Sequence, residues 1–257
     1  MSTAELTGSL LSKESQLVAP EMEIMDRATY PVEIRDLTIK KGDYTVLNNV
    51  SLILEEGIFA ALVGPSGCGK TSLLRVLSQL DRPSDGIVRF WGEEAEQKNG
   101  TIWLEDRHFY PLVTYVPQTL ALWPHLTIRE NMLFASNELP GTQSKLESLC
   151  EYLEIARILD RRPPNVSQGQ RQRCALVRAL LLNPRILLLD EITAALDEDL
   201  AKNVWNLLRQ FARDGGSILA STHGARLASA CDYSYRIRGK RVICERLLSV
   251  SGNRQPP

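Results

Sequence analysis

The stretch GPSGCGKTS, Gly64–Ser72, lies between the apolar run IFAALV (58–63) and the leucine-rich segment LLRVLSQL (73–80). It contains the pattern G-x-x-x-x-G-K-[ST], in the strand-to-helix context that phosphate-binding loops require. Glycines let successive backbone N–H groups converge on an anion, and the following helix adds its positive dipole end. A glycine-rich turn with an accidental lysine is the alternative. The stretch predicts a nucleotide-phosphate site formed by Gly64, Pro65, Ser66, Gly67, Cys68, Gly69, Lys70, Thr71 and Ser72.

Strand-like segments flank this loop on both sides. Segments 32–40, 50–57, 86–92 and 112–118 have the composition of strands, and Val50, Leu52 and Leu54 fall on one face of theirs. Further strands are expected at 185–191 and 217–222, with the helical segment 200–212 between them and a hairpin over 233–245. This alternation predicts the α/β class, with a mostly parallel sheet that helices cover.

Helical spacing of apolar residues appears in two regions. Leu73, Leu74, Leu77 and Leu80 predict a helix over 70–80. Segments 127–135, 144–159 and 168–182 predict further helices, with a break at Pro163-Pro164. We therefore expect a helical subdomain over about 119–182 within one domain spanning 31–250. Residues 1–30 are expected to form a loose extension and 251–257 a tail.

Composition excludes several classes of protein. The formal net charge is −1, so no nucleic-acid partner is expected. Apolar runs are far shorter than the ~20 residues that span a bilayer, and the first residues lack the pattern of a secretory signal or transit peptide. The cysteines, Cys68, Cys150, Cys174, Cys231 and Cys244, are scattered without C-x-x-C spacing. They indicate reduced thiols in the cytosol.

A pair of acids ends the buried segment RILLLDE (185–191). Ligands of open α/β sheets bind at the carboxyl ends of the strands, where Asp190 would lie. An aspartate there can hold Mg²⁺ together with the Thr71 hydroxyl, while Lys70 reaches the β- and γ-phosphates. Glu191 would then polarise an attacking water as general base. The alternative is that these acids only cap the helix that begins near Asp197.

Over residues 32–246 the chain resembles the ATP-binding cassette ATPases. The resemblance rests on the glycine-rich loop and on YVPQ, VSQGQRQR, ILLLDE, AALD and STH, which occur in the order and at the spacing of that family. It implies a P-loop NTPase (RecA-like) core with a mostly parallel sheet, an N-terminal antiparallel β subdomain and an inserted α-helical subdomain. It also implies ATP and Mg²⁺ as ligands.

The resemblance implies a site shared between two nucleotide-binding subunits, which form either a homodimer or a heterodimer. VSQGQ would be the signature segment, and Ser167, Gly169 and Gln170 would contact the γ-phosphate of ATP on the other subunit, with Asp197 meeting that subunit as well. Gln118 would sense Mg²⁺ and the attacking water, and His223 would contact the γ-phosphate. The alternatives are a strand end for Gln118, a core histidine for His223 and a helix N-cap for Asp197, the last being compatible with the implied role.

The chain departs from the family pattern at four places. Gln168 replaces the first of two signature glycines, which is harmless if that residue is helical but weakens the site if φ must be positive. Ile192 and Ala195 stand where the family usually has proline and serine. At the position where the family usually has an aromatic residue that stacks on adenine, this chain has Lys41. Tyr44 is the candidate to take over that contact.

These motifs favour the ATP-hydrolysing subunit of a transporter, an ATPase that works as a nucleotide-sandwich dimer with membrane permease subunits. WPHLTIREN (123–131) is similar to the corresponding segment of bacterial importers of polar amino acids and small solutes, and Thr127 and Glu130 also form a capping-box pattern. An importer implies an external solute-binding protein and a location on the cytoplasmic face of the inner or plasma membrane. The alternatives are an exporter or lipoprotein-release ATPase, a soluble ATPase of the same family, or a regulatory subunit without turnover.

Overall fold

A computed structural model of the chain describes residues 30–94, 97–98, 101–102, 109–136, 139–192, 196–222 and 231–246. The extension predicted over 1–30, apart from Tyr30, and the tail predicted over 251–257 lie outside the described residues. Within the described part, no helix has the length and apolar character needed to cross a bilayer.

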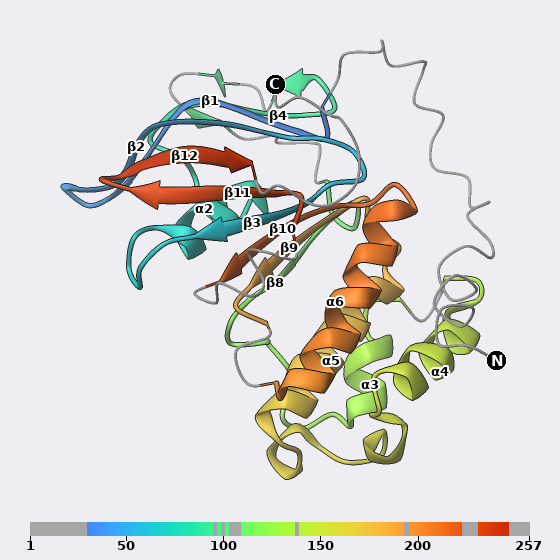
Figure 1. The fold of residues 1–257 in the computed structure, drawn as a ribbon. Coiled ribbons are helices and arrows are strands. Elements are labelled where there is room, and N and C mark those ends of the chain that lie inside the picture. Colours follow the sequence, from blue (N-terminus) through green and yellow to red (C-terminus); the bar gives the residue numbers. More distant parts are fainter. Residues whose placement is uncertain are drawn as a thin grey trace.

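A six-stranded sheet forms the centre of the molecule, in the order β12-β11-β3-β10-β9-β8 (Figure 1). The strands from β11 to β8 pair in parallel, and only β12 pairs antiparallel, with β11. Every residue of β3, β9 and β10 is buried, as expected for parallel strands covered on both faces. The bounds are β3 Phe59–Val63, β8 Val113–Val116, β9 Ile186–Asp190, β10 Ser217–Thr222, β11 Tyr233–Arg238 and β12 Arg241–Arg246.

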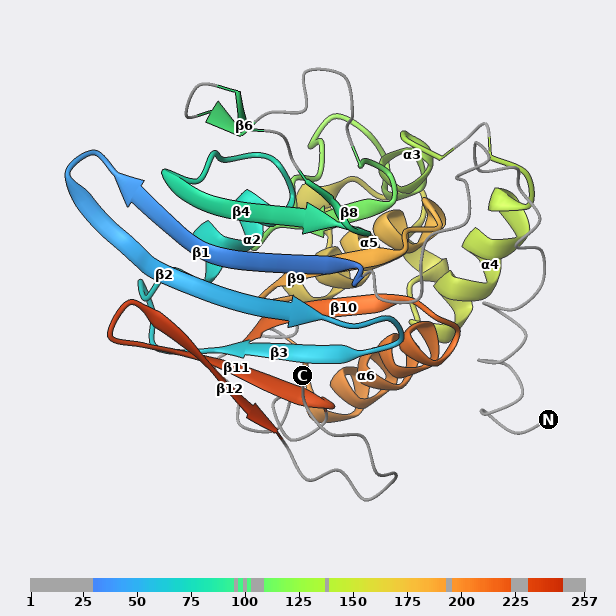
Figure 2. The same ribbon diagram turned by 90° about the horizontal axis from the view of Figure 1, so that it is seen from above.

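A second sheet is antiparallel and has the order β2-β1-β4-β5. Val50, Leu52 and Leu54 are buried in it while their neighbours Ser51 and Ile53 are more exposed, which confirms the predicted face. Figure 2 shows β1, β2 and β4 curving together across the molecule. The bounds are β1 Val32–Lys41, β2 Tyr44–Leu54, β4 Asp85–Phe90 and β5 Glu93–Glu94, and a separate short pair joins β6 Gln97–Lys98 to β7 Thr101–Ile102.

The six-stranded sheet separates two hydrophobic cores. Phe59, Ala61 and Val63 of β3 face a core shared with the helices α5 and α6. Ala60 and Leu62 face the other core, which they share with α2 and the antiparallel sheet. This alternation follows from the strand period of two. The helices are α2 Lys70–Leu77, α3 Ile128–Leu133, α4 Thr142–Tyr152, α5 Gln168–Leu181 and α6 Glu198–Arg213, with 3-10 turns η1 Ala156–Ile158 and η2 Pro163–Asn165.

The α/β fold class predicted from the sequence is confirmed, and two local expectations need correction. Leu80 does not continue the first helix: α2 ends at Leu77, Gln79 has φ 61°, and Leu80 is exposed. A residue in the left-handed region ends an α-helix. The helix predicted over 144–159 ends at Tyr152, because Glu154 has φ 55°. Pro163-Pro164 does form the predicted break, as the turn η2. The capping box at Thr127 and Glu130 is confirmed at the start of α3.

Candidate functional site

The glycine-rich loop joins the end of β3 to the start of α2 and uses its glycines for two different reasons. Gly67 and Gly69 have φ 75° and 114°, which residues with a Cβ rarely adopt. At Gly64 a Cβ would lie 2.6 Å from the Cys68 Sγ and 3.2 Å from the Ile237 carbonyl oxygen, so a side chain would have to displace Cys68 and press on β11. The loop can therefore curl at the start of a helix, which is the geometry that binds anions.

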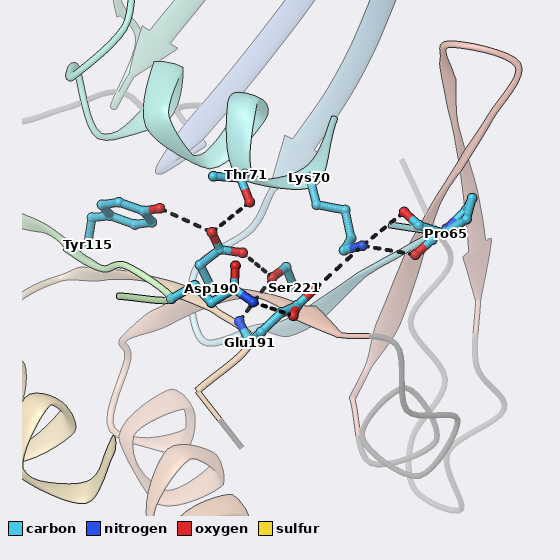
Figure 3. Close-up of polar contacts among 9 residues, drawn as sticks. Pro65, Lys70, Thr71, Tyr115, Asp190, Glu191 and Ser221 are labelled. Atoms are coloured by element: carbon cyan, nitrogen blue, oxygen red, sulfur yellow. Dashed lines mark hydrogen bonds and ion pairs between the residues drawn. The ribbon is translucent and has the colours of Figure 1, made fainter. Parts of the chain in front are cut away.

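Lys70 is the first residue of α2, and its side chain is buried against the loop (Figure 3). Its Nζ donates to the carbonyl oxygens of Gly64 at 2.9 Å and Pro65 at 3.1 Å. The same nitrogen lies 3.7 Å from the Glu191 Oε1. An ammonium group held by neutral carbonyls at the mouth of the loop can bind more strongly to phosphate oxygens, because their charge strengthens the hydrogen bond.

Asp190 is the last residue of β9 and contacts Thr71 of the loop, although the two residues are 119 positions apart in the sequence. The Thr71 hydroxyl donates to the Asp190 Oδ2 at 2.8 Å, and Asp190 is 1% exposed. The contact follows from the sheet order, because β3 and β9 flank β10 and point their carboxyl ends the same way. A hydroxyl and one carboxylate fit Mg²⁺ that arrives with nucleotide, since this ion takes few protein ligands beside phosphates and waters. The described residues contain no cluster of three His, Cys, Asp or Glu that could hold a metal by themselves.

Asp190 also accepts hydrogen bonds from two hydroxyl groups that the sequence analysis did not identify as part of the site. The Tyr115 OH on β8 donates to Oδ2 at 3.2 Å, and the Ser221 Oγ on β10 donates to Oδ1 at 2.5 Å (Figure 3). Burial, together with the charge of Asp190, raises the pKa of the Tyr115 phenol, which keeps it a hydrogen-bond donor. Both residues lie inside quoted motifs, YVPQ and STH, but only their strand positions reveal the contacts.

Glu191 follows Asp190 in the left-handed region, with φ 53°. Its backbone N–H donates to the Ser221 Oγ at 3.1 Å, and its Oε2 accepts from the Gln118 Nε2 at 3.0 Å. A proline at position 192 would push the preceding residue toward extended geometry. This chain has Ile192 there, which is buried in the core that β3 shares with α5 and α6. The restriction that proline imposes therefore does not act on Glu191.

Gln118 lies just beyond β8, on a segment that two helices anchor. From α5, Arg178 donates to the carbonyl oxygens of Leu120 and Ala121, each at 2.7 Å. Both of these residues have positive φ, 63° and 46°. From α3, the buried Asn131 accepts the Trp123 N–H at 2.7 Å. The position of Gln118 is thereby tied to α5, the helix that begins at the signature segment.

The signature segment caps the start of α5. The Ser167 Oγ accepts from the Gln170 N–H at 3.2 Å, and the Gln170 side chain accepts from the Ser167 N–H at 2.9 Å. Gln168 is exposed and is the first residue of the helix, without positive φ, so the helical alternative holds, while its effect on binding stays a prediction. Gly169 lies in the first turn. The role of this segment toward a second subunit stays a prediction.

The remaining predicted residues are placed only in part. Asp197 caps α6, where its Oδ1 accepts from the Leu200 N–H at 2.9 Å. His223 and Ala195 lie outside the described residues, and β10 ends at Thr222. Tyr44 begins β2 and is exposed, and the Lys240 Nζ lies over its ring at 4.6 Å from the centroid.

We expect Tyr44→Ala to weaken ATP binding by about 1 kcal/mol, or roughly fivefold in Kd, because a ring stacked on adenine would be lost. A fluorescent ATP analogue titrated into the purified chain measures this. Tyr44→Phe keeps the ring and is expected to keep the affinity of the parent. An unchanged Kd for Tyr44→Ala would assign the adenine contact to another residue.

Comparisons with known proteins agree with this geometry. The family model described as "ABC transporter" matches residues 47–194, which is more than half of the chain. The sulfate/thiosulfate import ATP-binding protein CysA of Ralstonia nicotianae is 36% identical over 191 residues, covering 71% of this chain and 49% of its own length. The spermidine/putrescine import ATP-binding protein PotA of Chromobacterium violaceum is 38% identical over 207 residues, covering 75% and 55%. The chain thus spans about half the length of the curated relatives it matches.

Solved structures extend the likeness to the whole cassette. The dimeric structure of MJ0796, a bacterial ABC transporter cassette, superposes with a TM-score of 0.75 at 27% identity, covering 85% of this chain and 99% of that one. The same cassette in a post-hydrolysis state bound to ADP and Pi superposes with a TM-score of 0.72 at 28% identity, covering 85% and 99%. The family model covers more than half of the chain, and the matched residues include the glycine-rich loop and the acid pair. The chain therefore belongs to the ABC transporter family.

Proposed function

We propose that the chain hydrolyses ATP and thereby energises transport through separate membrane subunits. One observation carries the proposal: the Thr71 hydroxyl bonds the Asp190 carboxylate at 2.8 Å, beside the buried Lys70 and the Glu191 carboxylate. Phosphate-loop ATPases need these four groups together for phosphoryl transfer to water. The domain boundaries 31–250, with a helical subdomain over about 119–182, belong to the same proposal.

Each residue of the site has a distinct task in this proposal. Loop N–H groups and Lys70 hold the β- and γ-phosphates, and Thr71 and Asp190 hold Mg²⁺, which neutralises phosphate charge when bound. Glu191 takes a proton from the attacking water. Gln118, whose amide already bonds the Glu191 carboxylate at 3.0 Å, orients that water. His223 adds a contact to the γ-phosphate.

The proposed active form is a dimer of nucleotide-binding subunits. Ser167 and Gln170 cap the start of a helix, and Gly169 lies in its first turn, where N–H groups favour an anion. These three residues complete the phosphate site of the other subunit. Asp197, at the start of α6, meets the opposite subunit. The dimeric structure of the MJ0796 cassette supports this arrangement.

Transport is proposed to be import. The relatives cited above carry names of import ATP-binding proteins, for sulfate and thiosulfate or for spermidine and putrescine. The partners are then membrane permease subunits and an external solute-binding protein, with the chain on the cytoplasmic face of the membrane. The rings of Trp123 and Phe134 pack at a tilt with their centroids 4.5 Å apart, and Phe134 is 64% exposed, which offers an aromatic contact for a permease.

The transport proposal predicts that the chain co-purifies from detergent-solubilised native membranes with a multi-span protein, and that a cognate solute stimulates ATP hydrolysis by that complex. Phe134→Glu should abolish co-purification, because a charge would enter an aromatic contact. Ile243→Glu, at a comparably exposed apolar residue of β12, should not. Recovery of no membrane protein, or equal loss with both variants, would contradict a permease docked at Phe134.

A further inference from the structure

A single buried hydroxyl connects the two acids of the site. The Ser221 Oγ donates to the Asp190 Oδ1 at 2.5 Å and accepts the Glu191 backbone N–H at 3.1 Å (Figure 3). We propose that Ser221 is a positioning residue for ATP hydrolysis, which sets the orientation of the Asp190 carboxylate and the backbone of Glu191. This inference rests on the proposed ATPase function.

The position of Ser221 follows from strand register. Residues Ser221 of β10 and Asp190 of β9 are partners in the parallel pairing of the two strands, and both are almost fully buried. A serine hydroxyl has one donor and two acceptor positions, so it can serve a carboxylate and an N–H at once. Alanine or valine at this position would leave the Glu191 N–H without this acceptor.

The contact with Asp190 sets the orientation of the carboxylate plane relative to the loop. Oδ1 is taken by Ser221, so Oδ2 is the oxygen that Thr71 and Tyr115 contact, at 2.8 and 3.2 Å. Without the Ser221 bond the carboxylate can rotate about its last torsion, which is soft. Ser221 therefore orients the oxygen proposed to hold Mg²⁺ without touching that ion itself.

The contact with Glu191 holds an unfavourable backbone geometry. A φ of 53° is uncommon for a residue with a long side chain and persists only where surrounding contacts maintain it. Ser221 holds the backbone N–H, while Gln118 and Lys70 contact the two carboxylate oxygens. Loss of the backbone contact would let Glu191 turn and carry the proposed general base away from the γ-phosphate.

The chain contains a matched control on the same strand. Ser217 lies four positions before Ser221 on β10 and is equally buried, and its Oγ donates to the Glu55 carbonyl oxygen at 3.0 Å. Ser217→Ala therefore removes a buried hydroxyl and one hydrogen bond at the opposite end of the strand from the acids. A purely structural role for Ser221 predicts similar effects of the two substitutions.

Steady-state ATP hydrolysis with the full chain compares Ser221→Thr with Ser221→Val, which have nearly the same shape but differ in the hydroxyl. We expect kcat about tenfold lower for Ser221→Val than for Ser221→Thr, with KM for ATP within about twofold of the parent. Ser217→Ala should leave kcat unchanged although it lowers Tm. Equal kcat for the threonine and valine variants, or losses of kcat that follow Tm in all variants, would overturn the inference. If valine prevents folding, Ser221→Ala takes its place.

Amide hydrogen exchange of the nucleotide-free chain tests the same contact without hydrolysis. The Glu191 N–H should exchange about tenfold faster in Ser221→Val than in Ser221→Thr, because it has lost its acceptor. If the unsubstituted chain does not hydrolyse ATP, the proposed function is refuted. The hydrogen bond from the Glu191 N–H to Ser221 is tested separately, by the difference in exchange rate between the two variants. Equal exchange in the two variants would refute the positioning role, whatever the activity of the parent.

Discussion

Lys70→Ala is expected to abolish measurable ATP binding. The Lys70 ammonium is buried at the mouth of the loop, where it bonds two carbonyl oxygens that phosphate oxygens would replace. Each hydrogen bond to a charged partner contributes about 1.5–3 kcal/mol. Losing two of them weakens binding by roughly a hundredfold or more. Isothermal titration calorimetry with ATP and Mg²⁺ measures the loss.

A second lysine supplies the control for the change in charge. Lys202 lies on the exposed side of α6, paired with Asp199 at 3.2 Å and Glu198 at 3.8 Å. Lys202→Ala also removes one positive charge, but at a residue outside the phosphate loop. We expect this variant to bind ATP with the Kd of the unsubstituted chain. Parent-like affinity of Lys70→Ala would show that the loop does not use this side chain for phosphate.

Glu191→Gln is expected to bind ATP but to hydrolyse it about a hundredfold to ten-thousandfold more slowly, as expected for loss of a general base. Glutamine keeps the size of the side chain and an oxygen for the Gln118 hydrogen bond, but it cannot take a proton from water. ATP should then accumulate in the sandwich and hold two copies together. Size-exclusion chromatography with Mg²⁺ and ATP should show a shift to dimer that ADP does not produce.

The control for Glu191 is an acid outside the site. Glu56 is exposed and pairs with Arg185 at 3.5 Å, and Glu56→Gln makes the same chemical change there. This variant should hydrolyse ATP at the rate of the parent and show no dimer shift. Hydrolysis by Glu191→Gln at the parent rate would assign the general base to another group. A monomer of Glu191→Gln at saturating ATP would contradict a sandwich made of two copies of this chain.

Much of the fold was predictable because its signals are local. Val50, Leu52 and Leu54 alternate with more exposed residues, so a strand with one buried face was readable from spacing alone. Thr127 and Glu130 lie three positions apart and form the capping box that their spacing predicts. Leu80 shows the limit of such signals. Its helical spacing continued past the point where Gln79 turns the backbone, and no spacing rule detects that turn.

The candidate site was predictable where a motif states both chemistry and context. The glycine-rich loop named Lys70 and Thr71, and the end of a buried strand named Asp190. Arg178 illustrates what was not predictable: its hydrogen bonds to Leu120 and Ala121 join residues more than fifty positions apart. Periodicity placed Arg178 on a helix but contained no information about which carbonyl groups it meets.

Taken alone, the sequence determined the α/β class, the phosphate loop and the identity of the acids, because these depend on neighbouring residues and on short repeats. Tertiary structure alone decided that the Ser221 and Tyr115 hydroxyls meet Asp190 and that Glu191 has φ 53°. The physical reason is that the register between parallel strands is set by burial of both sheet faces over the whole domain. Spacing within one strand does not specify which hydroxyl of the next strand lies beside a carboxylate.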